Sequence, residues 1–125
     1  MTNPVKNSAK NPVVWIEIPV LDLDAAMEFY GTVFGFKMKA IDGGPNMIAD
    51  FPSDGGVSGH LYPGTPSKDG STIHIAVPDT LEATMERCTK AGGTILSTPV
   101  TIPPGRFVYA SDPDGNSIGL FESRS

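Results

Sequence analysis

The sequence predicts an α+β fold made of two βαβββ modules. A Val-x-Asp motif ends an apolar run at Asp22 and again at Asp79, and each motif is followed by a helical stretch and then by glycine. The spacing from Asp22 to Gly35 equals that from Asp79 to Gly92. Such a repeat indicates one supersecondary unit used twice. We therefore expect a curved mixed sheet around a cavity, with the helices outside.

The composition describes one turn-rich domain of 125 residues, with 14 glycines and 12 prolines in no regular period. A net charge of -5 opposes nucleic-acid binding, which needs a basic surface. No apolar run approaches the roughly 20 residues that span a bilayer. The single Cys88 excludes an internal disulfide and fits a reducing compartment. These features predict a cytoplasmic protein without nucleic-acid or membrane partners.

The chain divides into four parts by composition. Residues 1–11 are polar and lack the apolar stretch of a secretory signal, so we expect an N-terminal tail. Residues 12–125 form the single domain. Within it, module one covers residues 12–62, a Pro/Gly/Ser/Asp-rich linker covers 63–71, and module two covers 72–122.

Module one opens with a strand at Val13–Val20, which is rich in β-branched and aromatic residues. Asp22 or Asp24 is a suitable N-cap for the helix that follows, and Gly35 is a suitable end. Short apolar runs separated by glycine-rich turns predict three further strands, at residues 36–41, 47–51 and 57–62.

Module two repeats this order. Its first strand is expected at residues 72–77, and Asp79 and Glu82 have the spacing of a capping box. The helix that follows places Cys88 on its buried face, where the thiol is inert. The run from Asp112 to Asn116 predicts a tight hairpin turn, because Pro presets φ and Gly and Asn accept positive φ. Three further strands are expected at residues 94–97, 107–111 and 117–122.

These motifs resemble the vicinal oxygen chelate superfamily, which includes glyoxalase I, bleomycin resistance proteins and extradiol dioxygenases. The strand, the Val-x-Asp motif, the helix with Phe29-Tyr30 and the following Gly35 are similar to its first module. The turn at 112–116 and the triplet at 118–120 are similar to the end of its second module. The resemblance covers residues 13–122. It implies paired βαβββ modules around a cavity, a divalent metal in many members, and a homodimer.

The resemblance also implies where a metal would bind. The implied ligands lie seven residues before the Asp of each Val-x-Asp motif and at the centre of each last-strand triplet. Those positions are Trp15, Gly59, Thr72 and Gly119. None offers the imidazole, carboxylate or thiolate that transition metals require. The sequence therefore resembles the metal-free branch of the superfamily, and we expect neither a metal nor another cofactor.

Several of these residues are candidates for ligand binding. Glycine in a strand often marks the close approach of a ligand, so Gly59 and Gly119 either open the cavity floor or relieve crowding beneath Trp15. Trp15 and Phe121 are expected to form apolar walls, and Thr72 is included by its position. Arg106 follows a Pro-Pro-Gly loop at the expected cavity mouth and either binds a carboxylate or phosphate or is solvated.

The candidate catalytic residues are Glu17 and His74. They are repeat mates, and strand alternation puts each on the cavity face. A carboxylate beside an imidazole supplies a general acid or base, or a structural bridge between the modules. His60 has the opposite parity from Gly59 and is expected to point away from the cavity. A register slip of one residue would instead turn it inward, and His60, His74, Glu17 and Glu122 would form an unorthodox metal site.

Three classes of function follow. The first is a glyoxalase/bleomycin-resistance-like protein that binds a small organic molecule in an apolar cavity without a metal. The alternative is a metal-dependent enzyme with displaced ligands, either a lyase resembling lactoylglutathione lyase, an isomerase or a dioxygenase. The third is a subunit that uses the fold only for assembly. If the protein is an enzyme, the resemblance favours a lyase or isomerase related to glyoxalase, and the ligand is left open.

Overall fold

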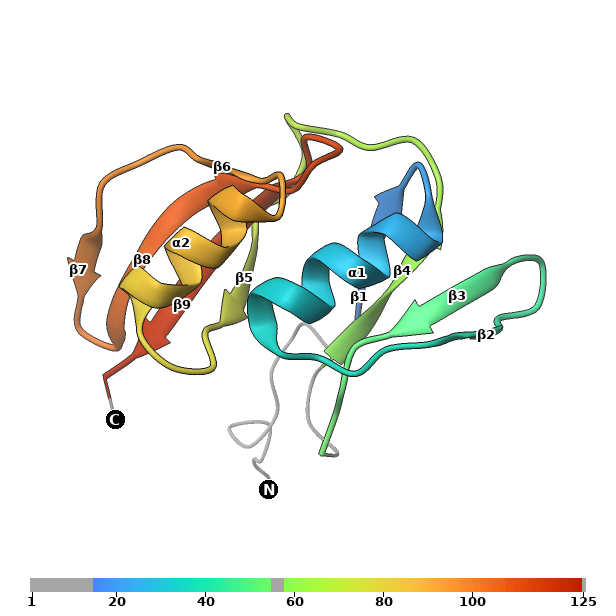
Figure 1. The fold of residues 1–125 in the computed structure, drawn as a ribbon, viewed down its shortest axis with the longest axis horizontal. Coiled ribbons are helices and arrows are strands. Elements are labelled where there is room, and N and C mark those ends of the chain that lie inside the picture. Colours follow the sequence, from blue (N-terminus) through green and yellow to red (C-terminus); the bar gives the residue numbers. More distant parts are fainter. Residues whose placement is uncertain (1–14, 55–57, 125) are drawn as a thin grey trace, which may run out of the picture.

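A computed structural model describes residues 15–54 and 58–124 and shows two similar modules side by side (Figure 1). The predicted tail at residues 1–11 lies outside the described residues. Module one contains β1 (Trp15–Val20), α1 (Leu23–Phe34), β2 (Ala40–Asp42), β3 (Met47–Asp50) and β4 (Ser58–Pro63). Module two contains β5 (Ile73–Ala76), α2 (Leu81–Lys90), β6 (Thr94–Ile95), β7 (Val100–Ile102), β8 (Gly105–Ser111) and β9 (Ser117–Ser123).

Each module forms its own mixed sheet. The first has the strand order β1-β4-β3-β2, and the second has the order β5-β9-β8-β6 with β7 paired to β8. In both sheets the first strand of the module runs parallel to the last one, and the other pairs are antiparallel. The α+β prediction is therefore confirmed, with two mixed sheets that do not close into a barrel. β1 and β5 are edge strands of their sheets.

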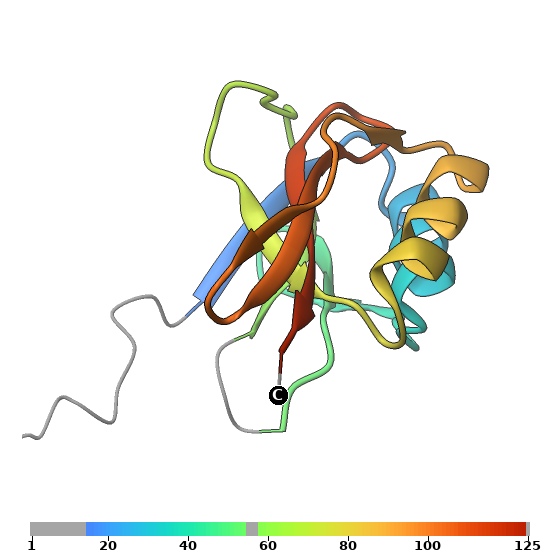
Figure 2. The same ribbon diagram turned by 90° about the vertical axis from the view of Figure 1, so that its left-hand side faces the viewer.

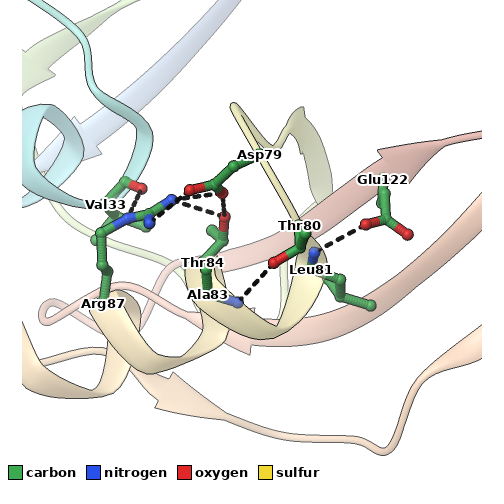
Figure 3. Close-up of polar contacts among 8 residues, drawn as sticks. All are labelled: Val33, Asp79, Thr80, Leu81, Ala83, Thr84, Arg87 and Glu122. Carbon is green, nitrogen blue, oxygen red and sulfur yellow. Dashed lines mark hydrogen bonds and ion pairs between the residues drawn. The ribbon is translucent and has the colours of Figure 1, made fainter.

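Local sequence explains both helices. The Asp22 carboxylate accepts a hydrogen bond from the Ala25 backbone N–H at 3.0 Å, and α1 ends at Gly35 with φ of 78°. Both ends are as predicted. The predicted capping box of α2 is wrong, because Thr80 and not Asp79 is the N-cap. The Thr80 hydroxyl accepts from the Ala83 N–H at 3.1 Å (Figure 3).

Several strands differ from their predicted bounds. Residues 36–39 are not in a strand, and β2 begins only at Ala40. β7 was not predicted. β8 begins at Gly105 and not at Phe107, so Arg106 belongs to a strand and not to a loop. The turn at 112–116 is confirmed, with Gly115 at φ of 91°.

Both helices lie on the same side of the two sheets (Figure 2). The core between helices and sheets contains Ile18 and Leu61 from module one and Ile118 and Leu120 from module two, all essentially inaccessible to solvent. Cys88 is buried there, and burial raises the pKa of its thiol to about 11. Neither α1 nor α2 is long and apolar enough to span a membrane.

A buried carboxylate joins the modules. Asp112, in the turn of module two, accepts hydrogen bonds from the Tyr30 hydroxyl of α1 at 2.9 Å and from both the backbone and the side-chain amide of Asn116. The same Asn116 amide donates to the Pro19 carbonyl at 2.7 Å. Burial raises the pKa of Tyr30 well above its usual value, and the Asp112 charge adds to the effect. The turn is thus fixed to both β1 and α1.

Two further hydrogen bonds cross between the modules. The Asp114 carboxylate accepts from the Leu21 N–H at 2.9 Å. The Arg87 guanidinium of α2 donates to the Val33 carbonyl of α1 at 2.9 Å (Figure 3). Arg87 also donates twice to Asp79, and these hydrogen bonds lower the pKa of the Asp79 carboxyl to about 2. The side-by-side arrangement of the modules therefore rests on polar contacts as well as on the shared core.

Candidate functional site at the seam between the modules

The sheet faces that point away from the helices form what we call the inner face, which no helix covers (Figure 2). Because Ile18 and Leu61 point toward α1, strand alternation places Glu17 and His60 on the opposite side. The register between β1 and β4 sets Glu17 directly beside His60. The prediction that His60 points away from this face is therefore wrong. The inner face comprises Trp15, Glu17 and His60 in module one and His74, Tyr109, Gly119 and Phe121 in module two.

On module one, three side chains form a chain of polar contacts. The indole N–H of Trp15 donates to Nδ1 of His60 at 3.0 Å. Nε2 of His60 lies 3.6 Å from Oε1 of Glu17. The His60 side chain is only 16% exposed, whereas that of Glu17 is 61% exposed. The imidazole is thus held between an indole and a carboxylate that faces solvent.

On module two, the imidazole of His74 packs among aromatic rings. Its ring centroid lies 4.9 Å from that of Phe107 and 5.9 Å from those of Tyr109 and Phe121. A Cβ at Gly119 would collide with Nδ1 of His74, so this glycine makes room for the ring. Partial burial lowers the pKa of His74 below its usual value. Among the described residues, no hydrogen bond reaches the His74 imidazole. Its Nδ1 packs against Gly119, which leaves Nε2 as the ring nitrogen that can meet a ligand.

The predicted contact between Glu17 and His74 is wrong. The two repeat mates belong to different sheets, and within residues 15–54 and 58–124 no hydrogen bond or ion pair joins them. The glycines also differ from expectation. A Cβ at Gly59 would collide with the Ile16 carbonyl, so Gly59 permits close backbone contact between β4 and β1. Gly59 also lines a cavity between the modules, whereas Gly119 makes room for the His74 ring.

Two cavities lie along the seam between the edge strands β1 and β5, and both contact Ile73. The larger measures about 350 Å³ and is lined by Ile16, Phe36, Phe51, Pro52, Ser58, Gly59, Ile73, His74, Ile75 and Ala76. The smaller measures about 210 Å³ and is lined by Glu17, Ile18, Pro19, Ser67, Gly70, Ser71, Ile73, Asn116 and Ser117. The larger cavity is mainly apolar, and the smaller is rich in oxygen-bearing side chains. The seam therefore presents His74 in one cavity and Glu17 in the next.

A third cavity, of about 540 Å³, lies on the helix side between α1, the end of α2 and the turn at 112–114. It is larger than either seam cavity, but its lining includes four carboxylates, those of Asp22, Glu28, Asp112 and Asp114. Small-molecule sites are typically apolar with a few polar groups, a description that fits the larger seam cavity better. We therefore take the seam as the candidate site.

Two other predicted binding residues have partners within the protein. The hydroxyl oxygens of Thr72 and Ser117 lie 2.5 Å apart, beside the smaller seam cavity. Arg106 is not at a cavity mouth on the seam, because its guanidinium binds Glu82 of α2 and Glu122 of β9. These hydrogen bonds lower the pKa of both carboxyls. Arg106 lines a different cavity, of about 200 Å³, together with Thr101 and Arg124, and its expected role in ligand binding stays a prediction.

The side chains of the seam do not form a metal site. Among the described residues, no three His, Cys, Asp or Glu side chains come together in a way that would hold an ion. Nδ1 of His60 is already occupied by Trp15, and Glu122 is bound to Arg106. The alternative site of His60, His74, Glu17 and Glu122 is therefore wrong. The donor set of the seam does not fit a transition metal.

The role of His60 was not predicted from the sequence, because the residue of module one that corresponds to Gly119 was taken to be Gly59 and not His60. The registers show that His60 beside Glu17 corresponds to Gly119 beside His74. A signal was present in the sequence. Trp15 and Glu17 are two residues apart on one strand and so share a face, as Ser58 and His60 do on another strand. Pairing these two faces places His60 on the inner face.

The fold and the seam define a protein of the glyoxalase type, and comparisons with known proteins agree. The sequence model of the Glyoxalase/Bleomycin resistance protein/Dioxygenase superfamily matches residues 13–120. The chain belongs to this superfamily. It is 35% identical over 121 residues to a "Glyoxylase-like domain-containing protein" of Didymella fabae, covering 84% of this chain and 88% of that one. It is 31% identical over 107 residues to the "Putative glyoxylase CFP32" of Mycobacterium bovis, but it spans only 41% of that protein's length.

Solved structures show the same fold. A glyoxylase/bleomycin resistance protein/dioxygenase domain from Frankia superposes with a TM-score of 0.68 at 22% identity, covering 91% of this chain and 98% of that one. A superfamily member from Sphaerobacter thermophilus superposes with a TM-score of 0.64 at 25% identity, covering 92% and 99%. The family resemblance expected from the sequence is thereby confirmed.

Proposed function

We propose that the protein binds a small organic molecule in the seam between its modules, without a catalytic metal. The supporting observation is the larger seam cavity. Its volume of about 350 Å³ falls within the range of small-molecule sites, roughly 300–1,000 Å³. Apolar side chains from both modules line it, and the imidazole of His74 is one of its few polar groups. A neutral imidazole both donates and accepts a hydrogen bond, so His74 orients the ligand.

The proposal extends to chemistry only through Glu17 and His74. If the bound molecule is a substrate, these two side chains are the available general acid and base, and the superfamily favours a lyase or isomerase related to glyoxalase. Trp15 and Phe121 supply inner-face surface beside the cavities. The homodimer that the resemblance implies and a cytoplasmic location remain predictions.

A dye titration tests the binding proposal. The probe is N-phenyl-1-naphthylamine, a neutral dye that fluoresces in apolar surroundings. Ala76→Trp places an indole at the wall of the larger seam cavity, at an exposed position that tolerates it, and should weaken dye binding about tenfold or more. Ala25→Trp is the matched control, because it fills the helix-side cavity instead and should leave binding unchanged.

Two results would contradict the proposal. The first is that the dye does not bind, or that Ala25→Trp abolishes its binding and Ala76→Trp does not. The second concerns the metal. Elemental analysis of the purified protein should find no stoichiometric transition metal, and a first-row metal at full occupancy would overturn the metal-free assignment.

A further inference from the structure

We propose that Glu17 accepts a hydrogen bond from the polar end of the seam ligand, and that Trp15 and His60 are positioning residues that orient its carboxylate. The ligand class that follows is an apolar molecule that carries a hydroxyl or amine donor. This inference rests on the proposed function, because it assumes that the seam binds a ligand.

Trp15 determines which nitrogen of the His60 imidazole carries the proton. The indole of Trp15 is a hydrogen-bond donor only, so the nitrogen that it contacts must have a free lone pair. That nitrogen is Nδ1, at 3.0 Å from the indole nitrogen. In a neutral imidazole the proton then resides on Nε2. Trp15 thus fixes the tautomer of His60.

The protonated nitrogen of His60 is the one beside Glu17. Nε2 lies 3.6 Å from Oε1 of Glu17, which is too far for a hydrogen bond but near enough for the N–H dipole to attract the carboxylate. His60 is mostly buried and held by Trp15, whereas Glu17 is mostly exposed. The fixed ring therefore limits where the carboxylate rests. An oriented acceptor loses less side-chain freedom on binding than a free one.

Glu17 has unused capacity to accept hydrogen bonds. An ionised carboxylate has about four acceptor positions. Among the described residues, no hydrogen bond reaches the Glu17 carboxylate, and Nε2 of His60 lies beside it at 3.6 Å. Its side chain lines the smaller seam cavity, which adjoins the apolar one at Ile73. A ligand whose apolar body fills the larger cavity therefore meets an acceptor at the next one.

The difference between the two modules supports a ligand whose polar end points toward Glu17. At the equivalent place in module two, the first-strand side chain is His74 and the last-strand residue is Gly119. No carboxylate stands there, and the surrounding side chains are aromatic. The inner face is thus polar on module one and apolar on module two. This asymmetry gives the ligand one orientation along the seam.

Two probes that differ in one donor test the inference. 2-Naphthol and 2-methoxynaphthalene share the same aromatic body, but only the naphthol donates an O–H. The protein should bind 2-naphthol about three- to tenfold more tightly, because only the naphthol can donate a hydrogen bond to the Glu17 carboxylate. The exposure of Glu17 to solvent keeps this advantage small. Calorimetric titration of both probes measures the ratio of their dissociation constants.

Variants test whether Glu17 causes the difference between the two dissociation constants. Glu17→Leu should bring their ratio close to one, and Glu17→Gln should give an intermediate value. Glu86→Gln is the matched control, because Glu86 is an exposed carboxylate of α2 that pairs with Lys90 and should not affect the ratio. His60→Leu should lower the ratio, whereas His60→Gln, which keeps a donor toward Glu17, should restore most of it.

The outcomes separate the inference from the proposed function. Equal binding of both probes to the natural protein, or a preference that survives Glu17→Leu, overturns the inference alone. Binding of neither probe overturns both.

A nitrogen NMR experiment tests the positioning without any ligand. At pH 8, where a free imidazole is neutral, long-range ¹H–¹⁵N spectra should show His60 protonated at Nε2 only. Trp15→Phe should give a mixture of both tautomers. His74 is the internal reference, since the chain has 2 histidines. A proton on Nδ1 of His60 in the natural protein would refute the inference.

Discussion

Residues that occupy matching places in the two modules have different tasks. Asp22 caps α1, whereas its mate Asp79 leaves the capping of α2 to Thr80 and binds Arg87 instead. The difference follows from one neighbouring residue, because Thr80 supplies an acceptor one position nearer the helix. The repeat therefore determines where the elements lie, and the local side chains determine what each position does.

The inner face shows the same divergence. In module one the ring belongs to the last strand, as His60, and the carboxylate to the first. In module two the ring belongs to the first strand, as His74, and the last strand has only Gly119 beneath it. Two copies of one backbone thus produce a polar half-site and an apolar half-site. A site with two unlike ends suits an amphipathic ligand better than a symmetric one.

The largest expected effect is on the buried contact that joins the two modules. Asp112→Ala removes the acceptor of the Tyr30 hydroxyl and of two Asn116 donors in a buried place. Leaving these groups unpaired should lower the free energy of unfolding by about 3–5 kcal/mol. Urea denaturation measures the loss. Asp114→Ala is the control, and it should cost about 1 kcal/mol. Equal losses in the two variants would argue against a central role for Asp112.

The next effect distinguishes the two inner-strand glycines. Gly59→Ala sets a Cβ against the Ile16 carbonyl, which cannot move without parting β4 from β1, and should cost about 3 kcal/mol. The three atoms nearest to a Cβ at Gly119 all belong to the His74 side chain, which can rotate away, so Gly119→Ala should cost about 1 kcal/mol. Adding His74→Ala should recover most of the second loss and none of the first. A smaller loss for Gly59→Ala than for Gly119→Ala would contradict these assignments.

The smallest effect concerns the mates Asp22 and Asp79. Asp22→Ala removes a helix cap and should cost about 1 kcal/mol. Asp79→Asn should cost less near neutral pH. Because the pKa of Asp79 is lowered from 3.8 to about 2, its contribution is present above about pH 4 and is lost as the pH falls through 2.

Thermal unfolding followed from pH 7 to pH 2 tests the Asp79 contribution. Asp79→Asn should flatten the decline in melting temperature below pH 4. An unchanged decline in this variant would show that the pair with Arg87 does not contribute to stability.

Much of the fold was predictable because short-range signals control it. The cap at Asp22, the stop at Gly35 and the turn at 112–116 each depend on a few adjacent residues. β7 was missed because Val100 and Thr101 are largely exposed and prolines flank the strand, so no buried alternation marks it. Residues 36–39 carry a strand-like pattern, but they connect α1 to β2 without pairing.

The site was harder to predict because it depends on register. A shift of one residue between β1 and β4 decides whether His60 or Gly59 joins Glu17 on the inner face, and the sequence marks that choice only through the alternation of polar residues on the two strands. The supposed pairing of Glu17 with His74 assumed that repeat mates face one another. They lie instead on separate sheets, where each contacts its own module.

The contacts of the turn at Asp112 affect how the protein folds during its synthesis on the ribosome. Tyr30 and its acceptor Asp112 are 82 residues apart, and Leu21 and Asp114 are 93 apart. While the chain is being synthesised, Leu21 and the hydroxyl of Tyr30 therefore lack their hydrogen-bond acceptors until Asp112 and Asp114 have been added. Module one can collapse early, but it reaches its final packing only after the turn of module two has left the exit tunnel.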